Sequence, residues 1–345
     1  MAGMRDIAKL AGVSLSTVSV VLADGKKKVS DSNRQKVLEA VRTLNYQNPP
    51  KKQDTRKTVA VVLPVLTSSF FTNVFSGIEV TLSEGKNLIL YYNSNYNFDK
   101  EIACLKTLKK QMLAGIIINS ICPINKELEY LDWLKREFID HNIPVVLLER
   151  EVTSENFYCV FVDNQNSAYI ATEHLINQGH TKIAHISGNE LTIQYKDRLT
   201  GYKNALRDHG ISFDPELVRK GDFTPLSGYL AMKQLLNIRS DFSAVFSAND
   251  QMAIGSIKAI KEYGKSVPKD VAVVGFDNLS VTTLIEPSLS TVNVPAYQMG
   301  KVAAGIILDV SEGKTCLRTN KLPTNLIVRR SSDGVGTNEW VLTGW

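Results

Sequence analysis

The sequence of 345 residues lacks the features of membrane and secreted proteins. No apolar run approaches the roughly 20 residues that a membrane-spanning helix needs. No apolar segment near the N-terminus resembles a secretory signal, so we expect a cytoplasmic protein. The four cysteines are scattered without a Cys-x-x-Cys pair, which predicts neither a disulfide framework nor a zinc site. They are Cys104, Cys122, Cys159 and Cys316.

Motifs of catalysis and nucleotide binding are also missing. The chain contains no Gly-x-Gly-x-x-Gly, P-loop, His-Glu-x-x-His or Gly-x-Ser-x-Gly pattern, and its five histidines are dispersed. We interpret His180, in the segment GHTKIAHISG, as structural. The sequence therefore predicts no catalytic residue, no cofactor and no metal site, and it favours a binding protein over an enzyme.

Positive charge is concentrated near the N-terminus. Residues 1–57 contain twelve Lys or Arg and five Asp or Glu, whereas the remainder contains 28 and 30. A basic segment on a nearly neutral body is typical of a protein that binds a polyanion. The alternative is a solvated basic tail, but these charges interleave with an apolar helical pattern and do not form a block.

Residues 5–46 predict three short helices. Gly12 and Val13 form a tight turn, Ser14 caps the second helix, and Ser30 caps the third. The predicted inward-facing residues are Ile7, Ala8, Leu10, Ala11, Val18, Val21, Leu22, Val37, Leu38, Val41 and Leu44. A helix, a short glycine-containing turn and a second helix form a helix-turn-helix unit, which places its second helix in the DNA major groove. A small helical bundle of another purpose is the alternative.

From residue 59 onwards, short apolar runs alternate with helical patterns. The predicted strands are 59–63, 88–92, 115–118, 145–148, 159–162, 183–186, 244–246 and 271–274. Such alternation indicates parallel sheets with helices on both faces, and this many units suit two sheets better than one. We therefore predict two doubly wound lobes. A ligand should bind between them, at the carboxyl ends of the strands.

The segment DIAKLAGVSLSTVSVVL, residues 6–22, resembles the N-terminal signature of the lactose-repressor (LacI/GalR) family of bacterial transcription regulators. The resemblance continues to about residue 332. It implies a small all-α helix-turn-helix DNA-binding head and an α/β periplasmic-binding-protein-like core of two doubly wound parallel-sheet lobes. The implied divisions are 1–46 for the head, 47–57 for a basic linker, 58–161 with 293–321 for lobe one, 162–292 with 322–332 for lobe two, and 333–345 for a flexible tail.

By this resemblance, Leu15, Ser16 and Val20 read DNA bases. The family typically has Arg at the position of Val20, where it pairs with guanine, whereas Val can only contact a thymine methyl group or pack inside the head. Backbone contacts are expected from the basic run and from polar side chains. The predicted DNA-contacting residues are Ser14, Leu15, Ser16, Thr17, Ser19, Val20, Lys26, Lys27, Lys28, Ser30 and Arg34.

The linker departs from the family pattern. Family members usually read Y-x-P-N-x-x-A-R-x-L, which forms a hinge helix whose Leu enters the minor groove. After Tyr46 this chain reads QNPPKKQDTRKT, without the Ala-Arg pair or the Leu. We therefore expect no such helix here. Phosphate contacts are expected instead from Lys51, Lys52, Arg56 and Lys57.

Candidate effector contacts follow the predicted strands. Two acids, an arginine and an amide at a cleft suit bidentate bonding of vicinal hydroxyl groups, and a phenylalanine can stack on a sugar or a base. The resemblance assigns ligand contacts to Arg198, Asn249 and Asp277. The full predicted set is Phe70, Phe71, Glu149, Arg150, Asp163, Arg198, Asn249 and Asp277. As alternatives, Asp163 and Asp250 cap helices and the two phenylalanines belong to the core.

Together these features predict a sequence-specific transcription regulator, most simply a repressor. It should bind a pseudo-palindromic double-stranded DNA operator as a homodimer, because one head binds too weakly. The tail has no apolar heptad, so no tetramerising coiled coil is expected. The expected effector is a small molecule, a sugar or sugar derivative. Three alternatives stay open: control by a phosphocarrier-type protein co-regulator, a sugar-binding transport protein without DNA function, and an enzyme.

Overall fold

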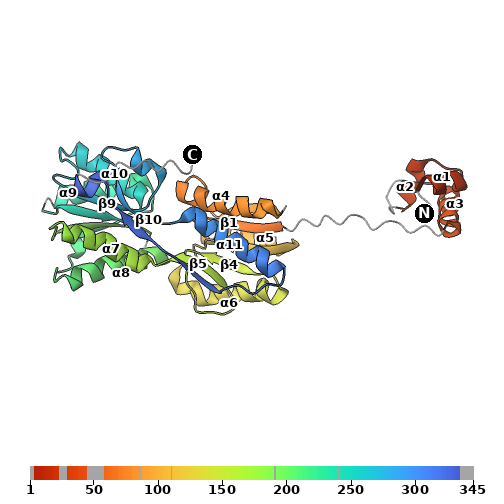
Figure 1. Cartoon of the computed structure of the whole chain (residues 1–345), viewed down its shortest axis with the longest axis horizontal. Coiled ribbons are helices and arrows are strands. Elements are labelled where there is room, and N and C mark those ends of the chain that lie inside the picture. Colours follow the sequence, from red (N-terminus) through yellow and green to blue (C-terminus); the bar gives the residue numbers. More distant parts are fainter. Residues whose placement is uncertain are drawn as a thin grey trace. The chain divides into compact units, whose positions relative to one another are not determined.

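The computed structural model describes residues 4–22, 29–44, 58–85, 87–109, 111–189, 192–239 and 241–334. The chain divides into two units, residues 1–55 and 56–345, which we call the head and the core (Figure 1). The predicted linker at 47–57, the basic run Lys26–Lys28 and most of the tail lie outside the described residues. Within the described ranges, no helix is long and apolar enough to cross a membrane.

The head contains helices α1 (Met4–Ala11), α2 (Leu15–Leu22) and α3 (Asp31–Thr43). Gly12 adopts a φ of 63° between the first two, a left-handed conformation that glycine adopts at little cost. The Ser14 Oγ accepts a hydrogen bond from the Thr17 N–H, and the Ser30 Oγ accepts one from the Asn33 N–H. The buried residues of the three helices are Ile7, Ala11, Val18, Val21, Val37 and Ala40.

Two of the predicted inward-facing residues of the head are exposed. Leu10 is 53% exposed and Leu38 is 44% exposed. Leu38 lies one residue beyond Val37, which places it about 100° around the helix from the buried stripe. Leu10 likewise flanks the line from Ile7 to Ala11. The interior of three short helices is narrow, so it accepts only the central residues of each stripe.

The core contains two six-stranded sheets, which define its two lobes. The strands of lobe one are β1 (Thr58–Leu63), β2 (Leu88–Asn93), β3 (Leu113–Ile118), β4 (Val145–Leu148), β5 (Tyr158–Val162) and β11 (Thr319–Leu322). They lie in the order β11-β5-β4-β3-β1-β2, and all pairs are parallel. All side chains of β4 and β5 are buried, as expected of central strands covered on both faces.

Lobe two repeats this arrangement with one antiparallel edge. Its strands are β6 (Ile183–Ser187), β7 (Val218–Lys220), β8 (Ala244–Ser247), β9 (Ala272–Asp277), β10 (Ser290–Asn293) and β12 (Asn325–Ile327). Their order is β12-β10-β9-β8-β6-β7, and only β12 runs antiparallel to its neighbour among these described strands. The chain passes between the lobes after β5, after β10 and after β11.

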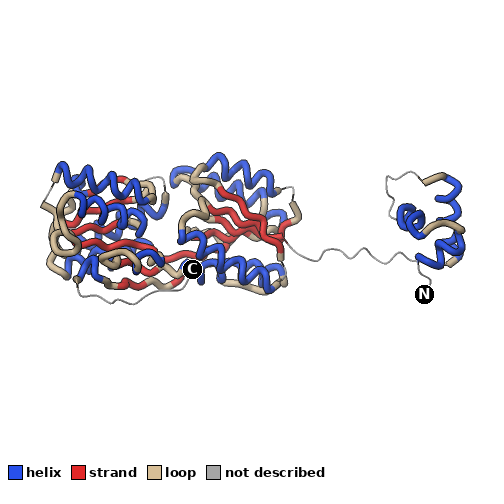
Figure 2. The backbone as a smooth tube through the Cα atoms, turned by 90° about the horizontal axis from the view of Figure 1, so that it is seen from above, coloured by secondary structure: helices blue, strands red, loops and turns tan. Residues whose placement is uncertain are grey.

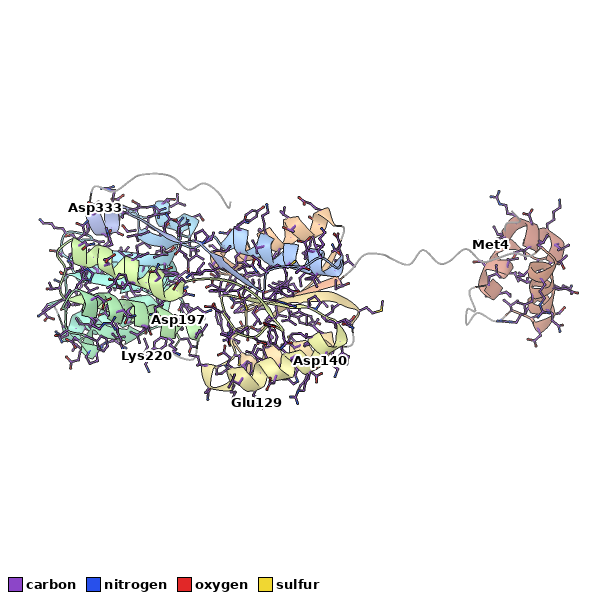
Figure 3. The ribbon with its side chains drawn as sticks, turned by 60° about the horizontal axis from the view of Figure 1, so that its bottom comes forward. Met4, Glu129, Asp140, Asp197, Lys220 and Asp333 are labelled. Carbon is purple, nitrogen blue, oxygen red and sulfur yellow. The ribbon has the colours of Figure 1, made fainter. Side chains whose placement is uncertain are left out.

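Helices cover both faces of each sheet (Figure 2). In lobe one, α4 (Ser69–Glu84) and α11 (Ala296–Ser311) pack on one face, and α5 (Phe98–Leu108) and α6 (Glu127–Glu137) on the other. In lobe two, α7 (Asn164–Asn177) and α8 (Ile193–Asp208) face α9 (Pro225–Ile238) and α10 (Asp250–Glu262) across the sheet. A short α12 (Arg330–Asp333) ends the described chain. Exposed charged residues such as Glu129, Asp140 and Lys220 mark the outer surfaces (Figure 3).

Glycine permits the closest of these helix contacts. A Cβ atom at Gly77 of α4 would lie 2.1 Å from the Tyr297 carbonyl oxygen of α11, and one at Gly300 would lie 2.0 Å from the Val74 carbonyl oxygen. Two backbones that approach this closely leave no room for a side chain. The contact joins the first helix of the core to the helix that returns from lobe two, and so fixes lobe one as a unit.

Candidate functional sites

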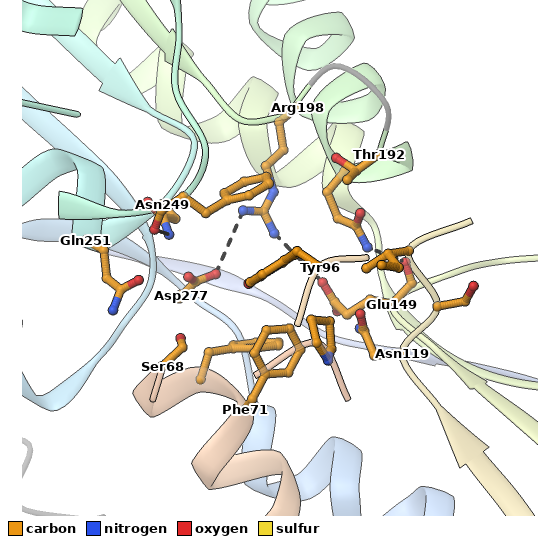
Figure 4. Close-up of a pocket in the computed structure, with 16 residues that line it drawn as sticks. Ser68, Phe71, Tyr96, Asn119, Glu149, Thr192, Arg198, Asn249, Gln251 and Asp277 are labelled. Carbon is orange, nitrogen blue, oxygen red and sulfur yellow. Dashed lines mark hydrogen bonds and ion pairs between the residues drawn. The ribbon is translucent and has the colours of Figure 1, made fainter. Parts of the chain in front are cut away.

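A cavity lies between the lobes at the carboxyl ends of the strands (Figure 4). It encloses about 610 Å³ of space free of protein atoms, part of it open to solvent. Its lobe-one lining is Pro64, Ser68, Phe70, Phe71, Tyr96, Asn119, Ser120, Ile121 and Glu149. Its lobe-two lining is Thr192, Gln194, Arg198, Phe223, Asn249, Gln251 and Asp277.

Strand ends explain how residues so distant in the sequence meet here. Pro64 follows β1, Asn119 follows β3 and Glu149 follows β4, while Asn249 follows β8 and Asp277 ends β9. Parallel strands bring their carboxyl ends to one edge of the sheet. The edges of the two sheets face each other across the cavity, so each lobe contributes side chains to a common space.

Arg198 of α8 is the buried cation of the cavity, with 4% of its surface exposed. Its Nε donates to the Asn164 Oδ1 over 2.9 Å, and one terminal nitrogen donates to the Ala248 carbonyl oxygen. The guanidinium carbon lies 3.7 Å from the centre of the Phe276 ring, a cation–π contact. These three partners belong to lobe two, so the arginine is held in place from its own lobe.

Two carboxylates flank this guanidinium. One terminal nitrogen lies 3.8 Å from the Glu149 Oε2 and the other lies 3.8 Å from the Asp277 Oδ1 (Figure 4). Both distances exceed a hydrogen bond, so the groups attract without direct bonding. Glu149 belongs to lobe one and Asp277 to lobe two. The Glu149 Oε1 is buried and has no hydrogen-bond partner among the described residues.

Burial dominates the protonation of these acids. It raises the pKa of Glu149 to about 7, against the opposing attraction of Arg198. It also raises the pKa of Asp277 well above its ordinary value; Arg198 opposes this, and the nearby carboxyl groups of Asp250 and Glu149 add to it. Since a buried charge is costly unless it is paired, both groups would be stabilised by hydrogen-bond donors from a ligand.

Six of the eight predicted effector residues line the cavity, whereas Arg150 and Asp163 do not. Arg150 donates to the Glu127 Oε1 and to the Cys122 carbonyl oxygen, both over 2.9 Å. The backbone turns at Glu149, which has a positive φ, and the Arg150 side chain is held by Glu127 and Cys122 outside the cavity lining. Asp163 caps α7 by accepting from the Asn166 N–H, and it pairs with Lys321. Neither side chain therefore lines the cavity.

Phe70 and Phe71 serve both roles that the sequence left open. They line the cavity, yet they are 7% and 9% exposed and belong to the core of lobe one. Their rings meet edge to face with centres 5.2 Å apart. Asp250, in contrast, lies behind the cavity, where its side chain accepts from the Leu279 N–H and the Thr291 hydroxyl.

Tyr96 and Phe223 line the cavity but were not predicted from the sequence. Both have positive φ values, 52° and 70°, and so have Glu149 at 56° and Asp277 at 114°. Thus four of the seven described non-glycine residues with positive φ line this one cavity. Such conformations cost energy outside glycine and concentrate at functional sites. The only available sequence signal was the turn-rich composition around each residue.

In the head, α2 presents polar and apolar side chains to solvent. Leu15 is 44% exposed, and Ser16 and Ser19 are also exposed. Val20 is half-buried, but it is not among the residues packed on the buried core of the head. Thr17 and Arg34 are half-buried, and Ser14 and Ser30 act as helix caps. The exposed side of α2 is therefore available to a partner.

Comparison with known proteins identifies the family. Residues 3–48 match the family described as bacterial regulatory proteins, lacI family, and residues 172–332 match the periplasmic binding protein-like domain. The HTH-type transcriptional repressor CytR of Escherichia coli (strain K12) is 32% identical over 338 residues, 96% of either chain. The chain belongs to the lacI family of bacterial regulatory proteins. Catabolite control protein A of Priestia megaterium is 33% identical over 309 residues, 88% of this chain and 90% of that protein.

Solved structures of lacI-family regulators share this fold. The lac repressor dimer bound to operator and the anti-inducer ONPF has a TM-score of 0.73 at 25% identity and covers 96% of this chain and 99% of its own. The complex of the regulator CelR with cellobiose has a TM-score of 0.71 at 30% identity, covering 96% and 100%. The family and the fold class predicted from the sequence are confirmed. The relatives are transcription regulators and not enzymes.

Proposed function

We propose that this lacI-family regulator represses transcription as a homodimer on a pseudo-palindromic operator, and that a sugar or a related polyhydroxy compound bound between the lobes changes its operator affinity. The buried Arg198, flanked by one carboxylate from each lobe, is the observation that carries the ligand part of this proposal. This arrangement suits bidentate bonding of hydroxyl groups. Solved relatives bind cellobiose and, in an Enterococcus faecium regulator, ribose.

The proposed effector contacts are Phe70, Phe71, Glu149, Arg198, Asn249 and Asp277. The Asn249 Oδ1 accepts from the Met252 N–H and its Nδ2 donates to the Phe223 carbonyl oxygen, so the second N–H of the amide is the donor left for a ligand. The rings of Phe70 and Phe71 supply an apolar wall against which the C–H face of a sugar ring can pack. The polar groups then fix the orientation of its hydroxyl groups.

A ligand in this cavity can change the arrangement of the lobes, because the proposed contacts belong to both of them. Glu149 extends from lobe one towards Arg198 of lobe two, and the Gln194 Nε2 of lobe two donates to the Glu149 carbonyl oxygen over 3.1 Å. A ligand that bonds both Glu149 and Arg198 favours the lobe arrangement in which both are within reach. A ligand that binds one arrangement better shifts the equilibrium towards it, which is the requirement for allosteric control.

The proposed DNA contacts of the head lie on α2 and around it. We propose that Leu15, Ser16, Ser19 and Val20 reach base edges. The phosphate backbone is proposed to bind Ser14, Thr17, Ser30, Arg34 and the basic run Lys26, Lys27 and Lys28. Val20 can contact a thymine methyl group. The half-buried state of Val20, outside the packed core of the head, supports this assignment.

Replacing Val20 tests the recognition part of the proposal. Val20→Arg should shift operator preference towards guanine at one position of each half-site, because Arg bonds guanine bidentately with about 1–3 kcal/mol of discrimination. In vitro selection of operators with both proteins measures the preference. Lys9→Arg, a conservative change on α1, is the control. If the selected half-sites are identical for wild type and Val20→Arg, Val20 does not read DNA.

Thermal unfolding against a panel of sugars, sugar derivatives and nucleosides tests the ligand part. A ligand at about 100 times its dissociation constant stabilises the protein by roughly 2.7 kcal/mol, which such a scan resolves. We expect a hit whose stabilisation disappears in Arg198→Ala. A blank panel would overturn the small-molecule proposal and favour the alternative, control by a phosphocarrier-type protein, which a pull-down from cell extract would then identify. One relative is named catabolite control protein A.

A further inference from the structure

The charges that line the cavity are unequal. Among its described lining residues, Arg198 is the sole cation, whereas Glu149 and Asp277 are both acidic. All three are strongly buried: the side chains of Arg198, Glu149 and Asp277 are 4%, 3% and 10% exposed. At pH values above the raised pKa values of both acids, where both are ionised, the lining carries a net charge of −1. Solvent screens these charges poorly, so the sign of the imbalance acts directly on a ligand.

The two lobes contribute differently to this imbalance. Arg198 and Asp277 both belong to lobe two and neutralise each other. Glu149 comes from lobe one, whose part of the lining contains no described cation that could compensate it. The nearest arginine in the sequence, Arg150, is bonded to Glu127 and Cys122 away from the cavity. Glu149 is therefore the residue that makes the cavity negative.

The hydrogen-bonding groups of the cavity also favour a ligand that donates hydrogen bonds over one that carries a negative charge. Two of the five N–H donors of Arg198 are already used by Asn164 and Ala248, and its ring-facing side lies on Phe276. The Glu149 Oε1 is buried without a partner in the described structure. A buried acceptor of this kind requires a donor. A hydroxyl or N–H group of a ligand can supply this donor, whereas an anionic group would meet a carboxylate there.

One feature favours an anion. Helices α4, α8 and α10 begin at the cavity, and helix N-termini attract negative charge. Two of them are capped by their own chain, because the Thr192 hydroxyl accepts from the Tyr195 N–H and the Asn249 Oδ1 accepts from the Met252 N–H. The side chain of Ser68 makes no such bond at α4. A phosphate group at this end would still face a cavity whose net buried charge is negative.

We propose that the cavity selects an uncharged polyhydroxy ligand that donates hydrogen bonds to Glu149 and Asp277, and that Glu149 is the residue that rejects phosphate esters and sugar acids. This inference rests on the proposed function and narrows its ligand class. Sugars and nucleosides without phosphate satisfy it. The corresponding phosphate esters, which have the same rings and hydroxyl groups, do not.

The test compares neutral compounds with their own phosphate esters. The full chain is titrated by calorimetry at pH 8 with ribose and ribose 5-phosphate, glucose and glucose 6-phosphate, and adenosine and AMP. In each pair that contains a binder, we expect the neutral compound to bind at least about 30-fold more tightly, since like charges are opposed in a buried site. In Glu149→Gln this ratio should fall below about fivefold, because the remaining Arg198 and Asp277 are balanced.

Glu151→Gln is the matched control, because it removes the same charge two residues further along, outside the cavity lining and on an exposed side chain. It should keep the wild-type ratio. If Glu149→Gln does not fold, Asp277→Asn removes the other acid and should narrow the ratio in the same way.

Three results would overturn the inference. An ester that binds the wild type as tightly as its neutral partner would refute charge selection while leaving a ligand-controlled regulator in place. A ratio that persists in a folded Glu149→Gln variant would refute the role of Glu149. A panel without any binder would overturn the proposed ligand control itself, and this inference with it.

Discussion

The two lobes have the same architecture but bring different chemistry to the cavity between them. Lobe two contributes Arg198 with its partners and a balancing acid, Asp277, so its polar groups are ordered by contacts within the lobe. Lobe one contributes an apolar wall and Glu149, whose Oε1 has no partner in the described structure. Two lobes of the same fold can therefore contribute differently to one site. The polar groups of lobe two are preorganised, whereas the acid of lobe one is left to bond a ligand.

The lobes also differ in how their strained backbone turns at the cavity are held in place. In lobe two, Asp277 and Asn278 have φ values of 114° and 57°, and the buried Arg329 braces this turn. Its guanidinium donates to the Asn278 Oδ1 over 2.8 Å and also to the Leu289 carbonyl oxygen and the Thr282 hydroxyl. In lobe one, Tyr96 has a φ of 52° but is 45% exposed. Strain at a site persists where the surroundings hold it. The Asp277 turn of lobe two is held by Arg329 of the same lobe, whereas Glu149 of lobe one, with a φ of 56°, accepts its backbone hydrogen bond from Gln194 of lobe two.

Of the substitutions that test this difference between the lobes, the removal of Arg198 should have the largest effect on ligand affinity and stability. Arg198→Ala leaves two buried carboxylates without a cation, so we expect ligand affinity to fall by at least about 100-fold and stability to fall by about 3 kcal/mol at pH 8. The stability loss should shrink towards pH 5, where the raised pKa values let the acids protonate. Calorimetry measures the ligand affinity, and denaturant unfolding measures the stability. Arg207→Ala, an exposed arginine of the same helix, should change neither, and an equal loss there would contradict the central role of Arg198.

Removing the brace of lobe two should have the next largest effect. Arg329→Ala leaves the acceptors on Asn278, Thr282 and Leu289 unsatisfied in a buried site, which costs on the order of 2–4 kcal/mol. The Asp277 turn should loosen, and ligand affinity should fall with it. Arg330→Ala is the matched control, because the side chain of this neighbour pairs with the exposed Glu286 among the described residues and its loss should cost less than about 0.5 kcal/mol. Equal unfolding midpoints for the two variants would argue against a brace.

Neutralising the acid of lobe one should stabilise the protein. Burial raises the pKa of Glu149 in the folded state to about 7, from an ordinary value of 4.5. The folded state therefore holds this proton more tightly than the unfolded chain, and stability falls as pH rises between these two values. Glu149→Gln removes the penalty, so we expect a gain of about 1–2 kcal/mol at pH 8 and almost none at pH 4.5. A variant less stable than wild type at pH 8 would mean that Arg198 compensates the charge fully.

Ligand affinity should depend on pH for the same reason. Arg198 lies 3.8 Å from the Glu149 carboxylate and Asp277 interacts with it electrostatically, while the Gln194 amide bonds only the Glu149 backbone carbonyl. A ligand hydroxyl that donates to the carboxylate favours its ionised form. Affinity should therefore weaken below pH 7, by about eightfold between pH 7.5 and pH 6. It should be constant above pH 7.5. Titrations of Glu149→Gln should show a flatter profile, and an unchanged pH dependence in that variant would assign the titration to another group.

Local patterns predicted most of the fold. The spacing of apolar residues gives α1 to α3, and the eight predicted strands have continuous apolar runs. The strands β7, β10, β11 and β12 were not predicted, because their sequences, such as VRK, STVN and TNKL, contain no such run. Their pairing depends on the neighbouring strand and not on their own composition. Leu10 and Leu38 show that an apolar pattern identifies the buried side of a helix only approximately.

The site was less predictable because it depends on side-chain direction. Glu149 and Arg150 are adjacent polar residues at a strand end, and the sequence does not state which of them faces the cavity. Asp163 is a helix cap, a role that its residue type allowed from the start. Tyr96 and Phe223 reach the cavity from turns with positive φ, for which neither residue type is typical.

Operator affinity with and without ligand tests the central claim most directly. Fluorescence anisotropy of a labelled operator, titrated with the full chain at saturating effector and in its absence, gives the two dissociation constants. We expect the two constants to differ by at least about fivefold for the wild type, and Arg198→Ala to bind operator with the same constant under both conditions. Equal constants for the wild type at saturating effector would contradict the claim that the ligand between the lobes controls DNA binding.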